Sequence, residues 1–158
     1  MANTQSMCTS FMGELLTGTH NFGTAPIRAA STADTFKAAL YVTTATINAS
    51  TTAYSATGEV TGTGYSAGGV TVTNATPPSS TNTSSTAGTA YWTPSASISY
   101  TTVTLTTAFD TVLIYNSTQS NKAVSVHTFG SQTVTAGTFT LTMPSNTTST
   151  ALLRLATT

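Results

Sequence analysis

Threonine alternates with apolar residues along much of this chain, and this two-residue period restricts the fold more than any other feature. Val70–Thr73 has the sequence VTVT, and Thr138–Met143 has the sequence TFTLTM. Successive side chains of a β-strand point to opposite faces of a sheet, so each segment would have one apolar face and one hydroxyl-bearing face. Branched and aromatic side chains also fit the pleated surface of a strand. The pattern predicts a mainly β protein.

Roughly seven to nine short strands, about ten residues apart and separated by turn signals, follow from this pattern. Asp34–Thr43 is the first strong strand, and Phe109–Tyr115 is apolar on both faces, as expected of a central strand. The other predicted strands are Val70–Asn74, Thr89–Trp92, Ser99–Thr107, Ala123–Phe129, Thr133–Met143 and Ala151–Leu155. Such a series is typical of an antiparallel β-sandwich, a jelly-roll-like fold or a partly open barrel.

One short helix is predicted at Thr9–Thr17, where Gly18 can end it. Phe11 and Leu15 lie four residues apart and would share one face of this helix. A helix of this length is unstable alone and needs to dock on a sheet or on a neighbouring subunit. We expect residues 1–8 to be a loose polar start, and residues 1–16 to help anchor the protein to a partner.

The length of 158 residues fits a single domain, with a short N-terminal arm and helix over about residues 1–18. Ala75–Gly88 is low in complexity and contains Pro77 and Pro78, which predicts a long exposed loop or an insertion at the edge of the sheet. Closely spaced glycines between Gly58 and Gly69 predict bulges and tight turns. We expect the Asn116–Asn121 segment to be a turn between two strands.

Charged side chains are scarce, at 5% of residues against about 25% in a typical soluble domain. The chain has a net charge of zero, and 41 threonines and 19 serines supply most of its polar groups. Soluble proteins usually keep a net charge that limits self-association. A neutral, hydroxyl-rich surface tolerates close neighbours, so we expect a subunit of a larger assembly. The alternative is that the hydroxyl groups hydrate a free protein well enough by themselves.

Patterns of catalytic, metal or cofactor sites are missing from the sequence. The two histidines, His20 and His127, have no accompanying Gly-x-Ser-x-Gly elbow, and the four acidic residues are widely spaced. Gly58–Gly69 lacks the lysine of a phosphate-binding loop, and the single cysteine, Cys8, is interpreted as a packing residue. We therefore predict that the protein is not an enzyme and uses no cofactor or metal. A glycosidase that brings two distant carboxylates together is the remote alternative.

Nucleic acid and membrane are not expected partners. Arg28 and Lys37 do not make a basic patch. No apolar run approaches the roughly 20 residues of a membrane-spanning helix. Phe11–Leu16 is too short for the core of a signal peptide. We expect the protein to be made in a cytoplasm.

Aromatic residues flank several predicted loops and could form an interface or a sugar-binding platform. The alternative is ordinary packing in the core and at strand ends. Together with the apolar face of the predicted helix, they give the candidate interface residues Phe11, Leu15, Tyr54, Tyr65, Tyr91 and Trp92.

Three segments in fixed order carry a resemblance: Cys8–Phe22 (CTSFMGELLTGTHNF), Asp34–Tyr41 (DTFKAALY) and Thr52–Val70 (TAYSATGEVTGTGYSAGGV). This order resembles a family of small virion structural proteins of tailed bacteriophages. The resemblance covers roughly the first 70 residues. The C-terminal half is similar only in its β pattern and in the strand end Leu113–Asn116 (LIYN).

The resemblance implies a β-rich accessory subunit of a phage particle, without a catalytic motif. Some such proteins sit on the head as decoration or cement proteins. The implied partners are the major capsid protein or other virion subunits, with a homo-oligomer on the particle. The implied location is the virion, after synthesis in the cytoplasm of the bacterial host. The alternative is a tail component, either an adaptor or a receptor-binding module that grips glycan.

Overall fold

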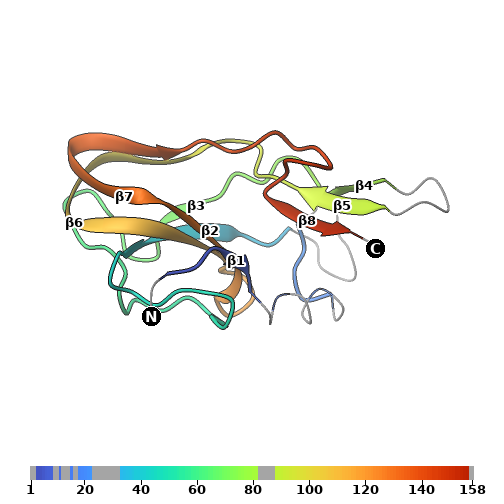
Figure 1. The fold of residues 1–158 in the computed structure, drawn as a ribbon, viewed down its shortest axis with the longest axis horizontal. Coiled ribbons are helices and arrows are strands. Elements are labelled where there is room, and N and C mark those ends of the chain that lie inside the picture. Colours follow the sequence, from blue (N-terminus) through green and yellow to red (C-terminus); the bar gives the residue numbers. More distant parts are fainter. Residues whose placement is uncertain are drawn as a thin grey trace.

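The computed structural model describes residues 3–8, 11, 15, 18–22, 33–81 and 88–156 of the chain. Within these residues, eight strands form two antiparallel sheets, in the order β1-β7-β6-β2-β3 and β4-β5-β8 (Figure 1). The strands are β1 (Ser6–Met7), β2 (Phe36–Val42), β3 (Val70–Thr71), β4 (Ser79–Ser80), β5 (Thr89–Trp92), β6 (Ile98–Asn116), β7 (Lys122–Leu141) and β8 (Leu153–Ala156). The predicted mainly β, antiparallel class is confirmed. The predicted helix Thr9–Thr17 lies outside the described residues, except for Phe11 and Leu15, and stays a prediction.

A single long hairpin, β6–β7, forms the centre of the larger sheet, with β2 beside β6. The turn between its strands has Ser120 and Asn121 at positive φ, which confirms the predicted turn. The prediction of separate strands on either side of residue 108 is wrong, and so is the corresponding split of β7. Register shifts around Phe109 absorb the break in alternation, so the strands bend there but do not end.

The hairpin curves so that its two halves lie in two layers, which gives a sandwich-like arrangement (Figure 1). Tyr100, in the first half of β6, donates a hydrogen bond from its hydroxyl to the Ala38 carbonyl oxygen in β2, at 2.8 Å. Phe109 meets Phe139 edge-on, with 5.0 Å between ring centroids. These contacts join the two layers, and the buried side chains between them form the core.

The N-terminal residues that the structure describes are not loose, contrary to our expectation for residues 1–8. Ser6 and Met7 pair with Val126 and Ser125 of β7 as an edge strand. Asn3 donates from Nδ2 to an Asp110 carboxylate oxygen at 2.8 Å. The same side chain donates to the Val42 carbonyl oxygen at 3.2 Å and accepts from the Ile47 amide at 3.0 Å. Backbone pairing and these side-chain hydrogen bonds therefore hold residues 3–8 against the rest of the chain.

The predicted exposed loop Ala75–Gly88 is exposed over residues 75–81. It is not entirely a loop, because Ser79 and Ser80 form β4 and pair with Tyr91 and Ala90. Two-residue pairing of this kind carries no alternating apolar signal, which is why the sequence did not reveal it. Residues 82–87 lie outside the described part.

Candidate interaction site

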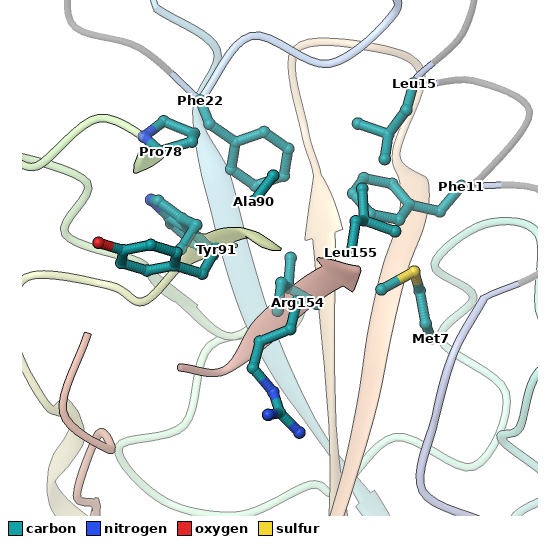
Figure 2. A pocket seen from close by; sticks show the side chains of 11 residues that line it. Met7, Phe11, Leu15, Phe22, Pro78, Ala90, Tyr91, Arg154 and Leu155 are labelled. Atoms are coloured by element: carbon teal, nitrogen blue, oxygen red, sulfur yellow. The ribbon is translucent and has the colours of Figure 1, made fainter. Parts of the chain in front are cut away.

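Four of the six predicted interface residues gather around one apolar hollow, which we call the apolar depression (Figure 2). It has a volume of about 80 Å³ and lies between the N-terminal segment and strands β5 and β8. The lining consists of Met7, Phe11, Leu15, Phe22, Pro78, Ala90, Tyr91, Trp92, Leu153, Arg154 and Leu155. Residues far apart in sequence thus meet at one place on the surface.

The floor of the depression is a rigid aromatic cluster. Phe22 stacks on Phe36 with 4.4 Å between centroids and meets Trp92 edge-on at 4.7 Å. Trp92 donates from Nε1 to the Asn74 side-chain oxygen at 2.8 Å, and Asn74 donates from Nδ2 to the Phe22 carbonyl oxygen at 2.8 Å. Because Asn74 ties the indole to the Phe22 backbone, this floor is held in one geometry.

The rim of the depression exposes an aliphatic side chain. Leu155 is 44% exposed and is the one large apolar residue classed as exposed in the described part of the chain. It points toward Phe11, whereas the Arg154 guanidinium points away from the depression (Figure 2). Arg154 makes one long hydrogen bond, at 3.4 Å, to the Thr148 carbonyl oxygen. The surface offered here is therefore apolar rather than charged.

The other two predicted interface residues, Tyr54 and Tyr65, lie elsewhere, around the buried carboxylate of Glu59. Tyr54 and Tyr65 donate from their hydroxyls to the two Glu59 oxygens at 2.6 and 2.7 Å, and the Gly68 amide donates at 2.8 Å. The structure does not bring these two tyrosines to the depression. The close sequence spacing of Tyr54, Glu59 and Tyr65 was the available signal for this cluster, and it was not recognised as one.

Burial keeps the clustered phenols protonated. Burial, followed by the nearby Glu59 carboxylate, raises the pKa of Tyr115 to about 12. Burial is also the main cause that raises the pKa values of Tyr41, Tyr54, Tyr65 and Tyr100 above the usual tyrosine value. The protonated Tyr115 hydroxyl donates to the Gly68 carbonyl oxygen at 2.8 Å, which ties the Gly58–Gly69 loop to the sheet.

A second polar cluster ties the N-terminal segment to the hairpin turn. The Asp34 carboxylate accepts hydrogen bonds from the Asn21 backbone N–H at 2.9 Å, from the Asn116 side chain at 2.7 Å and from the Gln119 side chain at 3.1 Å. The Asn116 side chain also lies 3.1 Å from His20 Nδ1. These hydrogen bonds occupy both oxygens of the Asp34 carboxylate.

His127 lies in the gap between the two halves of the β6–β7 hairpin, among apolar side chains. Burial lowers the pKa of His127 to about 4. Its Nε2 is 2.9 Å from the Ser125 hydroxyl, but Ser125 is itself fully buried, so this pair presents no accessible nucleophile.

Metal-binding clusters and membrane-spanning helices are not found among the residues that the structure describes. In that part of the chain, no group of three or more His, Cys, Asp or Glu side chains could hold a metal ion. Within the same residues, no helix has the length and apolar character needed to cross a membrane.

Comparisons of the chain with protein-family models, with curated proteins and with solved structures find no match. What can be said of function therefore comes from the residues themselves. Their arrangement forms an apolar depression at the surface, and the buried polar groups described above hold the fold.

Proposed function

We propose that this protein is a structural component of a bacteriophage particle, and most specifically a capsid decoration or cement protein. The observation that carries the proposal is the apolar depression beside the exposed Leu155, on a chain with only 5% charged residues. Covering this apolar surface with a partner would be favourable, because it removes apolar area from water. The proposal assigns the protein a role through contact, without catalysis, cofactor or metal.

The resemblance to phage virion proteins supports the same role. The segments that carry it supply much of the packed interior, including Cys8, Phe22 and Phe36, and they supply the Glu59 cluster. The similar residues are thus those that set the fold. A shared fold, rather than shared chemistry, is what a family of accessory structural subunits would preserve.

The proposed mechanism is stabilisation by preferential binding. A cement subunit binds the assembled shell and not the free shell subunits, so binding shifts the equilibrium toward the assembled state. Because a shell repeats the same site many times, the effect of a modest contact is multiplied over the lattice. The partners in this proposal are the major capsid protein or other virion subunits, with a homo-oligomer of this chain on the particle.

The alternative is a tail component, as an adaptor or as a glycan-binding receptor module. A glycan platform would need displayed aromatic rings. Trp92 and Tyr100 are each only 2% exposed, and Tyr54 stacks on Tyr115 with 4.7 Å between centroids. This packing favours the capsid role over the glycan-binding version of the alternative. A tail adaptor differs from a cement protein in its position on the particle.

The experiment uses phage particles whose gene for this protein has been deleted. We expect these particles to release their DNA at a lower temperature than wild-type particles, and we expect purified protein to bind their heads and restore the release temperature. A bovine serum albumin addition controls for non-specific protection. Heads of unchanged thermal stability that also fail to bind the purified protein would contradict the cement role.

A further inference from the structure

We propose that the apolar depression and β8 form a two-fold interface with a second copy of this chain, in which β8 pairs antiparallel with β8 of that copy. The inference deepens the proposed function, because it rests on the depression being a contact site and names its partner. Self-association is measured in solution without any particle, so it can fail or succeed independently of the virion role.

The outer edge of β8 has no pairing partner in the described part of the chain. In the three-stranded sheet β8 hydrogen-bonds to β5 on one side, and no described strand lies on its other side. An unpaired edge is a template for another strand. Pairing two copies would extend this small sheet to six strands, in the order β4-β5-β8-β8-β5-β4.

The same patch carries both a projecting and a receiving surface. Leu155 projects from β8, and the depression lies directly beside it, lined by Phe11 and Leu15 on the facing wall (Figure 2). A two-fold interface uses one patch on both copies, so each Leu155 can cover the partner's depression. The hollow of about 80 Å³ is larger than the roughly 10–15 Å³ that one water needs on this measure, and its apolar lining offers water no hydrogen bonds.

Charge selects the register. Among the described residues that line the patch, Arg154 is the one charged side chain, and its guanidinium points away from the depression. Pairing centred on Arg154 would place two arginines opposite each other, which is unfavourable. Pairing centred on Leu155 places Arg154 opposite Ala156 and brings the two leucines together over the depressions. The proposed register is therefore the one centred on Leu155.

The first test is sedimentation of the full-length protein over a range of concentrations. We expect a monomer–dimer equilibrium in the wild type and a dissociation constant raised about a hundredfold or more by Leu155→Asp, because two apolar side chains lose their burial. Thr61→Asp adds the same charge at an exposed site in the loop before β3, outside the depression, and should leave the equilibrium unchanged. A wild type that stays monomeric, or a dimer unaffected by Leu155→Asp, overturns the interface.

The second test fixes the register by oxidative cross-linking. In the proposed register, Leu155→Cys places two cysteines directly opposite each other, within the Cα separation that a disulfide allows. Arg154→Cys alone should not cross-link, whereas a mixture of Arg154→Cys and Ala156→Cys should. Ser80→Cys, on the exposed strand β4, controls for collisional cross-linking. Efficient cross-linking of Arg154→Cys with itself would overturn the register, and equal cross-linking at Ser80 would overturn the interface.

Discussion

Individual side chains in this protein show where its few charges are used. Glu59 is buried and accepts three hydrogen bonds, from Tyr54, Tyr65 and the Gly68 amide. The acid therefore connects the loop before β3 to the tyrosines that surround it. Its removal would leave three donors without an acceptor, so we expect Glu59 to stabilise the fold.

For Glu59→Ala we predict a loss of about 3 kcal/mol or more in the free energy of unfolding, because each unsatisfied buried donor costs about 1–3 kcal/mol. Glu59→Gln should lose less, since its amide oxygen still accepts while its NH₂ group faces a donor. Thr61→Ala, an exposed site in the same loop, should change the value by less than about 0.5 kcal/mol. Urea unfolding of the three variants checks the order, and a Glu59→Ala protein as stable as Thr61→Ala would contradict it.

His127 makes the stability of the protein depend on pH. Its pKa is about 4 in the folded protein, because burial opposes the charged ring, and about 6.5 in an unfolded chain. The unfolded state thus binds more protons between these values, so the free energy of unfolding falls as pH drops from about 6.5 to about 4. The loss is at most about 3 kcal/mol, since one pKa unit corresponds to about 1.4 kcal/mol and the ring is only partly exposed.

Comparison of the wild type with His127→Gln isolates this effect, because the carboxylates titrate equally in both proteins. We expect the wild type to lose more stability than the variant between pH 7 and pH 4. A direct NMR titration of the imidazole provides the second readout. Equal pH dependence in the two proteins, or a His127 pKa near 6.5 in the folded state, would contradict the assignment.

At the scale of strands and loops, the Gly58–Gly69 loop can approach β2 closely because Gly69 has no Cβ. Gly69 has a φ of 69°, and a Cβ there would collide with the Ala38 carbonyl oxygen. We predict that Gly69→Ala lowers the free energy of unfolding by about 2 kcal/mol or more, through backbone strain and displacement of β3. Thermal unfolding measures the effect.

Gly130 in β7 gives the matched control for this substitution. A Cβ at Gly130 meets no atom within 4 Å, so Gly130→Ala should stay within about 0.5 kcal/mol of the wild type. If both variants unfold at the wild-type temperature, the close approach of the loop to β2 is wrong.

The sequence predicted individual strands well where alternation and flanking turns agree. Thr89–Trp92, predicted as the start of a strand, forms β5, and Asp34–Thr43 contains β2. The two long strands were predicted as four short ones, because the irregular stretches near residues 106–108 and 130–132 break the alternation. The register of β6 and β7 shifts at these stretches, where the two layers pack, for example through the contact of Phe109 with Phe139. That contact joins residues 30 apart, so local sequence patterns do not predict it.

At the scale of the whole molecule, the candidate site could be predicted only in part. Apolar spacing identified Phe11 and Leu15, and aromatic position identified Tyr91 and Trp92, which meet at the apolar depression. Leu155 and Arg154 were not selected, because a single apolar residue near the end of a chain has no local signal of exposure. Only the pairing of β5 with β8 brings Leu155 beside the N-terminal segment.

A neutral β-rich protein with an apolar depression on its surface is suited to the repeated binding on a shell that we propose. The most direct test is the position and copy number of the protein on purified phage particles, by labelled-antibody electron microscopy and quantitative protein staining against the major capsid protein. We predict many copies spread over the whole head. A few copies confined to one vertex or to the tail, or none on the particle, would contradict the cement role.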